Sequence, residues 1–417
     1  MPNFSARENH YITRLKQKEA MEQMNPKRVD YWEKWSGEEW EAMADIVRSF
    51  NDSQDEYEVV MTPTGDSSSS PDLPLFLSAQ KQGRPPDLIG LEDHQITDLA
   101  AQKALIPLNG LIQSSEPSLS NYNGRFLELC TYAGKLYGVP SAADIVTLYV
   151  NLDMMKGTRF DAKMTANISE FDAGLDEFGK DNGIGFIPTY PGWWPHSWVW
   201  FFGGSWFDEK KNFSPALPAN IRAYEWISSF RKRWNLNAFS ETINPIGRRD
   251  PDPFLTGRVA MVLEGDWLIR RLLATPALNW APAPFPTMHG RPAALIVSDV
   301  LSIPQGARNP EGAAAFINFA IQSEQIERLA LGQGKISPLR RQSEYYISNH
   351  KNPHLQDLQK ILLSAELFYD PRVPQWMSRL SQIKQAFLSI WSGLATPPQA
   401  LNAINSARKL GKHELEE

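Results

Sequence analysis

The stretch SGEEWEAMADIVRSFNDSQDEYEVVMT, residues 36–62, indicates the fold class because a helical pattern is followed directly by a strand pattern. Ser36 and Glu39 have the spacing of a helix capping box, which predicts that a helix starts here. The helix is predicted to end near Asn51, and residues 57–62 have the composition of a strand. Apolar residues recur on one face of the predicted helix, at Trp40, Met43, Val47 and Phe50.

The same alternation continues along the chain. A helix is predicted over residues 71–82, a strand over 87–91 and a helix over 96–104. Strands that alternate with helices at this spacing favour an α/β fold with a mostly parallel sheet covered by helices. Further on, two short strands, 135–139 and 146–151, are predicted to flank a polar corner at Ser141–Asp144. The last 65 residues are predicted to be almost all helical.

Composition excludes several classes of protein. The 417 residues point to two or three domains, and 42% hydrophobic with 22% charged residues is typical of a globular protein. A net charge of −6 argues against a nucleic-acid partner. The single cysteine, Cys130, rules out an internal disulfide framework or a cysteine-rich zinc module, and its apolar neighbours predict that it is buried.

No catalytic motif stands in the sequence. A Walker loop, a Gly-x-Gly-x-x-Gly turn, a His-Glu-x-x-His pair and a Gly-x-Ser-x-Gly elbow are all missing. Ser229 and Lys232 match the Ser-x-x-Lys tetrad of β-lactamases, but they lie on a charged helix without the companion motifs. We therefore predict no catalytic residue, no metal and no cofactor.

Neither a secretion signal nor a membrane span is visible. The first 30 residues are polar and mixed in charge, without the apolar core of about 7–15 residues that a signal peptide needs. The longest apolar runs, such as residues 198–202 and 259–263, are far shorter than the about 20 residues of a membrane-spanning helix.

The unusual feature of the composition is its 14 tryptophans. Five of them fall between Trp193 and Trp206, mostly within YPGWWPHSWVWFFGG, residues 190–204. Flat indole faces suit the C–H faces of sugar rings, and they bury a large apolar area. Trp193, Trp194 and Trp198 are candidate ligand contacts, with packing in the core as the alternative. Trp200 and Trp206 are assigned to the core.

A second candidate site is the segment Glu264-Gly265-Asp266-Trp267, which follows a predicted buried strand and opens a helix. Open α/β sheets bind ligands beyond the carboxyl ends of their strands, so Asp266 and Trp267 are placed where a ligand would bind. The alternative for Asp266 is a role as helix N-cap.

Several motifs, in order, resemble those of the family 1 extracellular solute-binding proteins. These are the sugar-binding subunits of ABC importers and are related to the maltodextrin-binding proteins. The resemblance runs from about Tyr31 to about Lys409. It rests on the segments GRPPDL (83–88), YAGKLYGVP (132–140), LYVN (148–151), FLTGRVAM (254–261) and GDW (265–267).

This resemblance implies an α/β, two-lobe periplasmic-binding-protein type II fold, the Venus flytrap, with the ligand in a cleft between the lobes. It implies a polar N-terminal extension over residues 1–28. The N-terminal lobe would comprise 29–144 plus 299–345, and the C-terminal lobe 145–298 plus 346–417.

Carried over by position, the resemblance also assigns site residues. Asp144 matches a carboxylate that hydrogen-bonds sugar in the family, while Trp267 and the Trp193–Trp198 block match aromatic platforms. The resemblance also implies ligand contacts at Trp35, Asp66, Asp93, Asp299 and Trp376. For Asp66, Asp93 and Asp299 the alternative to a ligand contact is a solvated loop carboxylate, and for Trp376 it is helix packing.

The function implied is a monomeric, extracytoplasmic carbohydrate-binding protein, located in the periplasm or outside the cell and associated with the membrane through its transporter. By hinge closure it would deliver a mono- or oligosaccharide to the permease subunits of an ABC importer. Two alternatives stay open. One is a carbohydrate-active enzyme with Asp144 and Asp266 as its carboxylate pair, and the other is a cytosolic sugar sensor if the native chain starts at Met1.

Overall fold

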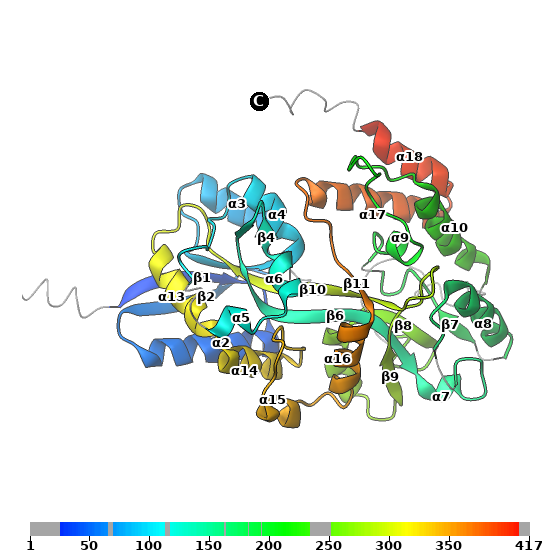
Figure 1. Ribbon diagram of the computed structural model, residues 1–417, viewed down its shortest axis with the longest axis horizontal. Helices are drawn as coiled ribbons and strands as arrows, with labels where there is room; N and C mark the ends of the chain where they lie inside the picture. The colour runs from blue at the N-terminus through cyan, green and yellow to red at the C-terminus, as the bar shows by residue number, and fades with distance from the viewer. Residues whose placement is uncertain are drawn as a thin grey trace, which may run out of the picture. The chain divides into compact units, whose positions relative to one another are not determined.

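The computed structural model describes residues 26–65, 70–112, 117–161, 164–181, 183–192, 194–233 and 252–407 (Figure 1). These residues form two compact units. Unit 1 is the described part of Met1–Ala142, Ser298–Gln333 and Ser337–Tyr346, and unit 2 is the described part of Ala143–Val297, Gly334–Ile336 and Ile347–Glu417. The predicted site residues Asp66 and Trp193, and nearly all of the predicted N-terminal extension, lie outside the described residues.

Unit 1 is built on a mostly parallel sheet. β1 (Lys27–Glu33) pairs in parallel with β2 (Tyr57–Pro63) and with β3 (Leu88–Glu92), and β10 (Ala293–Ser302) runs antiparallel to β3 with Asp299 opposite Glu92. A small hairpin joins β4 (Thr131–Tyr132) to β5 (Lys135–Leu136). The helices are α2 (Gly37–Ser53), α3 (Leu73–Lys81), α4 (Asp93–Ala101), α5 (Pro117–Ser120), α6 (Gly124–Leu129), α13 (Pro310–Ala320) and α14 (Ser323–Gln333).

The predicted helix after residue 36 is confirmed as α2, but its ends differ from the prediction. Ser36 is the N-cap, yet its side chain makes no capping hydrogen bond. The helix also continues past Asn51 to Ser53. The Asn51 amide instead holds the next strand: Nδ2 donates to the Val59 carbonyl at 3.0 Å, and Oδ1 accepts from the Val59 amide at 2.9 Å. Asn51 therefore fixes β2 against α2 and does not end the helix.

The predicted polar corner at residues 141–144 is wrong. One continuous strand, β6 (Val139–Asn151), replaces the expected break, and all of its residues are buried. Polar side chains can lie inside it because they find partners: Asp144 pairs with Lys335 at 3.2 Å, and Thr147 Oγ1 donates to the Ala283 carbonyl at 2.5 Å. The passage from unit 1 to unit 2 falls between Ala142 and Ala143, inside this strand.

Unit 2 has its own part of the sheet. β8 (Val259–Gly265) lies between β6, to which it is antiparallel, and β7 (Ile184–Phe186), to which it is parallel. β9 (Trp280–Ala283) pairs with β6, and β11 (Glu366–Phe368) pairs with the start of β10. The helices are α7 (Leu152–Met155), α8 (Ile168–Asp181), α9 (Trp198–Phe201), α10 (Pro218–Arg233), the 3₁₀ helix η2 (Asp266–Leu268), α12 (Ile269–Leu273), α16 (Leu355–Ser364), α17 (Trp376–Ser392) and α18 (Pro397–Ala407); α15 (Glu344–Asn349) straddles the two units.

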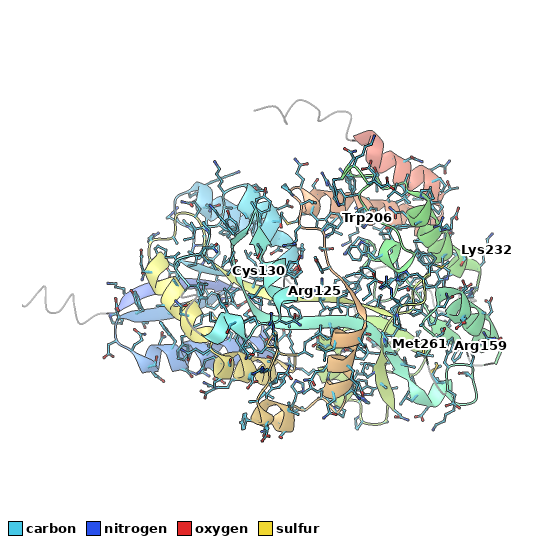
Figure 2. All side chains as sticks on the ribbon, viewed as in Figure 1. Arg125, Cys130, Arg159, Trp206, Lys232 and Met261 are labelled. Carbon is cyan, nitrogen blue, oxygen red and sulfur yellow. The ribbon has the colours of Figure 1, made fainter. Side chains whose placement is uncertain are left out.

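Cys130, labelled in Figure 2, is fully buried as predicted, and burial raises the pKa of its thiol. It packs in a cluster with Phe76, Ile89 and Leu99, where a small apolar side chain is needed. Within the described part of the chain, no helix is both long enough and apolar enough to cross a bilayer.

Asp87, in the GRPPDL segment, ties three parts of unit 1 together. Its buried carboxylate accepts hydrogen bonds from the backbone amides of Asp30 (2.9 Å), Arg308 (2.7 Å) and Asn309 (2.8 Å). One side chain thus joins β1 to the start of β3 and to the turn before α13. This network gives the sequence segment a structural role.

Replacing Asp87 with Ala leaves three backbone amides without their acceptor, at a cost of about 1–3 kcal/mol for each one that stays dry. We expect the free energy of unfolding to fall by about 3 kcal/mol or more in urea denaturation. Asp72→Ala is the matched control, because the exposed Asp72 accepts one bond, from the Leu75 amide at 2.9 Å, and should cost about 1 kcal/mol. Equal losses in the two variants would contradict this role.

Candidate functional site

Charged side chains gather in unit 1 where β1 and β3 end. Lys34 follows β1 directly, and its Nζ lies 2.7 Å from Asp299 Oδ1 and 3.7 Å from Glu92 Oε1. Lys34 and Asp299 are both buried. Because ligands of open α/β sheets bind beyond the carboxyl ends of the strands, this cluster is the candidate polar site of unit 1.

Glu33, the last residue of β1, extends the cluster inward. Its carboxylate accepts from the Tyr31 hydroxyl and from the Lys34 amide, the latter at 2.6 Å. Burial raises the pKa of Glu33 from 4.5 to about 7, and its hydrogen bond with Tyr31 and the charge of Lys34 only partly oppose that rise. Glu33 therefore titrates near neutral pH.

The structure brings two predicted residues of unit 1 into this cluster. Asp299 pairs with Lys34, and Asp93 begins α4, where its Oδ1 accepts from the Ser298 amide at 2.9 Å. Both are buried, so the alternative of a solvated loop carboxylate is wrong for them. Trp35 is also buried and packs in the core of unit 1, with Lys34 Nζ 5.6 Å from the centre of its ring.

In unit 2, two half-buried indoles face each other. The rings of Trp194 and Trp267 lie 5.9 Å apart at an angle of 33°. Trp267 Nε1 donates to the buried carboxylate of Glu264, which also accepts from the Gly265 amide at 3.1 Å. Glu264 thus fixes the Trp267 ring. Trp267 follows the carboxyl end of β8, which is where the sequence predicted it to stand.

The loop that carries Trp194 is held by three other side chains of unit 2. Ser197 Oγ donates to the Trp194 carbonyl at 2.8 Å, and Tyr224 OH donates to the Pro195 carbonyl at 2.7 Å. Trp206, which is labelled in Figure 2, was predicted to be core. It is buried, and its Nε1 donates to the His196 carbonyl at 3.1 Å. The loop is therefore rigidly placed, which suits a residue that presents a binding surface.

Asp144 and Asp266 form a buried acid pair in unit 2. Asp266 accepts from the amides of Ile145 (3.3 Å) and Ile336 (3.1 Å), which lie outside its own helix, so the N-cap alternative is wrong. Burial, the charge of Asp144 and a hydrogen bond between the two carboxyl groups raise the pKa of Asp266 well above its ordinary range. Lys335 Nζ, 3.2 Å from Asp144 Oδ2, compensates one negative charge.

Two further predicted tryptophans pack inside unit 2. Trp198 is buried, with its ring 5.6 Å from that of Phe285 and 5.8 Å from that of Trp226. Trp376, at the start of α17, is also buried, and its ring stands edge-on to His196 at 6.1 Å. Their positions fit the packing roles that the sequence left open.

Several residues of these clusters were not singled out from the sequence. Their only sequence signals were positional: Glu264 opens the segment that contains Asp266 and Trp267, and His196 lies within the aromatic block. The lysines among them pair with aspartates from distant parts of the chain, Lys34 with Asp299 and Lys335 with Asp144, which no local pattern reveals. The residues missed are Glu33, Lys34, Glu92, His196, Glu264, Lys335 and Asp370, whose Oδ1 lies 2.8 Å from His196 Nε2.

The arrangement offers apolar ring faces beside buried hydrogen-bonding groups, which is the chemistry of a site for a polyhydroxylated ligand. In the described parts of both units, no group of three or more His, Cys, Asp or Glu side chains could hold a metal ion.

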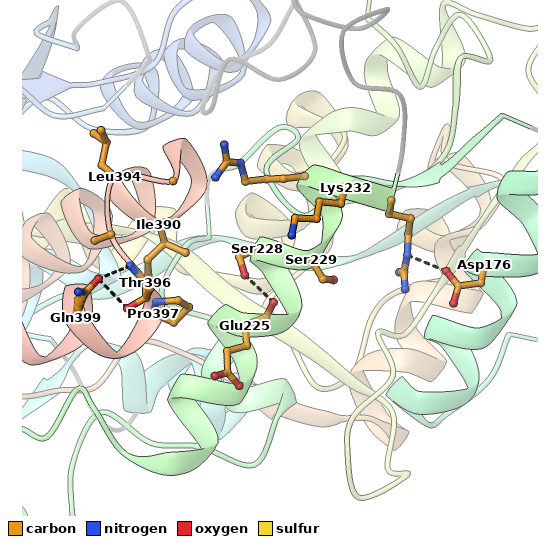
Figure 3. Close-up of a pocket in the computed structure, with 14 residues that line it drawn as sticks. Asp176, Glu225, Ser228, Ser229, Lys232, Ile390, Leu394, Thr396, Pro397 and Gln399 are labelled. Carbon is orange, nitrogen blue, oxygen red and sulfur yellow. Dashed lines mark hydrogen bonds and ion pairs between the residues drawn. The ribbon is translucent and has the colours of Figure 1, made fainter.

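A separate surface pocket of about 940 Å³ lies between α10 and the turn from α17 to α18 in unit 2 (Figure 3). Of the described residues that line it, none is aromatic and none is a predicted ligand contact. It contains the Ser229 and Lys232 pair, but Ser229 Oγ donates to the Trp226 carbonyl at 2.7 Å and Lys232 is exposed. This geometry gives no activated nucleophile.

Residues 45–355 match the protein family described as bacterial extracellular solute-binding protein. The chain is 25% identical over 202 residues to a maltooligosaccharide ABC transporter solute-binding lipoprotein of Streptococcus pneumoniae (strain ATCC BAA-255 / R6). That match covers 46% of this chain and 46% of the relative, so the chain spans about half the length of the curated relatives it matches.

Solved structures share the fold along nearly the whole chain. CpMnBP1 with mannobiose bound superposes with a TM-score of 0.79 at 24% identity, covering 91% of this chain and 98% of that one. Maltose-bound MalE3 of T. maritima gives a TM-score of 0.72 at 18% identity, covering 92% and 99%. These likenesses confirm the predicted α/β periplasmic-binding-protein fold.

The pKa of Glu33 predicts a pH-dependent stability. Because the folded state raises this pKa from 4.5 to about 7, it holds the proton more tightly than the unfolded chain, so Glu33 stabilises the fold at low pH and this contribution is lost as pH rises toward 7. Between pH 5 and pH 8 the loss is about 2–3 kcal/mol. Urea denaturation should show this slope in the wild type, and Glu33→Gln should remove it.

The control is Glu56→Gln, which alters an exposed carboxylate paired with Lys27. A slope that persists in Glu33→Gln, or disappears in Glu56→Gln, would contradict the assignment to Glu33.

Proposed function

The chain belongs to the bacterial extracellular solute-binding proteins, and on this premise we propose that it binds a sugar outside the cytoplasm and delivers it to an ABC importer. Of the proteins named above, one is a maltooligosaccharide ABC transporter solute-binding lipoprotein, and the two solved structures have mannobiose and maltose bound. The ligand proposed for this chain is therefore a mono- or oligosaccharide. Its partners would be the permease subunits of the importer, with the chain itself acting as a monomer.

The observation that carries the proposal is the Trp194–Trp267 pair with Glu264 behind it. Half-buried indoles that are locked in place expose flat apolar faces, and such faces contact the C–H face of a sugar ring. The part of each indole that is still exposed can be covered by a sugar ring, and covering it contributes about 25 cal/mol for each Å² of apolar surface.

A binding role is favoured over glycoside hydrolysis by the environment of Asp144 and Asp266. A glycosidase holds its two carboxyl groups about 5–9.5 Å apart, on either side of the bond it cleaves. Here the two groups share a hydrogen bond, and Asp266 is occupied by backbone amides. We therefore propose that the chain is not an enzyme and that these acids hold the protein framework.

The proposal is tested by a thermal-shift screen against monosaccharides, maltooligosaccharides and mannooligosaccharides. A ligand that binds only the folded state raises its apparent stability, and tryptophan fluorescence should change with the same sugars. No response to any sugar on the panel would overturn the proposal. Release of smaller sugars during the incubation would favour the enzyme alternative.

Replacing Trp267 with Ala should weaken the binding of a responding sugar by about tenfold or more, because one apolar face of the site is lost. Isothermal titration calorimetry measures this loss. Trp32→Ala is the matched control, since Trp32 is a half-buried indole of unit 1 that packs against its core. Equal affinities in Trp267→Ala and the wild type would remove Trp267 from the site.

A further inference from the structure

His196 is a buried polar side chain in an aromatic environment within unit 2. Only 4% of its surface is exposed, and its ring stands edge-on to Trp200 at 5.4 Å and to Trp376 at 6.1 Å. Trp194, one of the two candidate platforms, lies 6.4 Å away. His196 is thus a direct neighbour of one of the two candidate platforms.

The two ring nitrogens of His196 have different surroundings. Nε2 lies 2.8 Å from Asp370 Oδ1, and the carboxylate favours a proton on this nitrogen. Nδ1 is buried and has no hydrogen-bond partner among the described residues. In neutral histidine, a proton on Nε2 makes Nδ1 a hydrogen-bond acceptor.

The indole of the neighbouring Trp194 presents the opposite case, because its buried nitrogen is a hydrogen-bond donor. Trp194 Nε1 is buried and likewise lacks a hydrogen-bond partner within the described part of the chain, and an indole nitrogen can only donate. Buried polar groups are rarely left unpaired in folded proteins, and each one that stays dry costs about 1–3 kcal/mol. An acceptor and a donor therefore lie on two rings whose centres are 6.4 Å apart, and a hydroxyl group, which donates and accepts, suits either of them.

We propose that His196, oriented by Asp370, determines which sugars the site accepts: His196 Nδ1 and Trp194 Nε1 together bind hydroxyl groups of the ligand. A hydroxyl donates one hydrogen bond and accepts others, so it satisfies both atoms, whereas an aliphatic carbon satisfies neither. This inference rests on the proposed sugar-binding function and deepens it. Asp370 acts as a positioning residue, because its carboxylate favours the tautomer in which Nδ1 accepts.

The selectivity follows from the free-energy cost of leaving the two buried nitrogens, His196 Nδ1 and Trp194 Nε1, without hydrogen bonds. A site built to hydrogen-bond a hydroxyl rejects an analogue without it far more strongly than an apolar pocket rejects a missing methylene. One position of the sugar should therefore be read by His196 and Trp194, while the indole faces tolerate changes elsewhere. A buried water bound permanently to both atoms would give no such selectivity.

The experiment measures binding of maltose, mannobiose and their monodeoxy analogues by calorimetry. The wild type should bind one of the two disaccharides, and one of its monodeoxy analogues should bind about 10- to 100-fold more weakly. His196→Phe keeps the edge-on ring packing and removes Nδ1. It should weaken the parent sugar by about the same factor and no longer distinguish the parent from that analogue.

Two further variants separate this role from simple packing. Trp200→Phe changes the other side of the His196 ring without removing a buried unpaired atom, and it should keep the wild-type discrimination. Asp370→Asn withdraws the charge that favours the proton on Nε2, so it should reduce the discrimination without removing either contact atom. Thermal melting of each variant checks that it is folded.

Each failure has a distinct meaning. A wild type that binds neither disaccharide nor any sugar of the wider panel would overturn the proposed function together with this inference. A wild type that binds sugar while folded His196→Phe keeps both its affinity and its discrimination would overturn the inference alone. If His196→Phe is unfolded, unchanged discrimination in Asp370→Asn would overturn the role of the His196–Asp370 pair.

Discussion

Buried ion pairs are the constraint on which both units depend. β6 and β10 each run through both units, and each carries a buried aspartate: Asp144 in β6 pairs with Lys335, and Asp299 in β10 pairs with Lys34. Removing one partner of a buried pair costs about 3–5 kcal/mol, because the other charge stays behind without compensation. The lysines come from segments far away in sequence, so each pair fixes a connection that the backbone alone would not.

These pairs also explain what the sequence could and could not predict. The alternation of helix and strand from residue 36 onward correctly predicted an α/β fold, because hydrophobic periodicity is a local signal. The break at residues 141–144 was predicted wrongly, because Ser141 and Asp144 are polar and the buried partner of Asp144 lies at residue 335. Local patterns report where a polar residue stands but not whether a distant cation compensates it.

The tryptophans show the same limit in another form. Spacing identified the aromatic block but could not separate a platform from a core residue, and the structure divides them by what each ring touches. Trp198 and Trp206 are enclosed by other rings, while Trp194 and Trp267 stay half-buried beside each other. Glu264 holds the Trp267 ring through its Nε1, and Ser197 holds the Trp194 backbone through its carbonyl, by hydrogen bonds that no spacing rule describes.

The polar side chains of unit 2 discussed above consequently fall into two groups. Asp144 and Asp266, the acids that a sugar site or a hydrolase would use, are taken up by each other, by Lys335 and by backbone amides. Hydrogen-bonding capacity remains elsewhere, on Trp194 and His196, each of which has a buried nitrogen without a partner in the described part of the chain. Because a folded protein rarely tolerates such atoms without a compensating gain, we propose that unit 2 recognises its ligand through these nitrogens beside the indole faces and not through its carboxylates. A neutral donor and acceptor suit an uncharged, hydroxyl-rich ligand, since they recognise it without the desolvation cost that a buried charge would add.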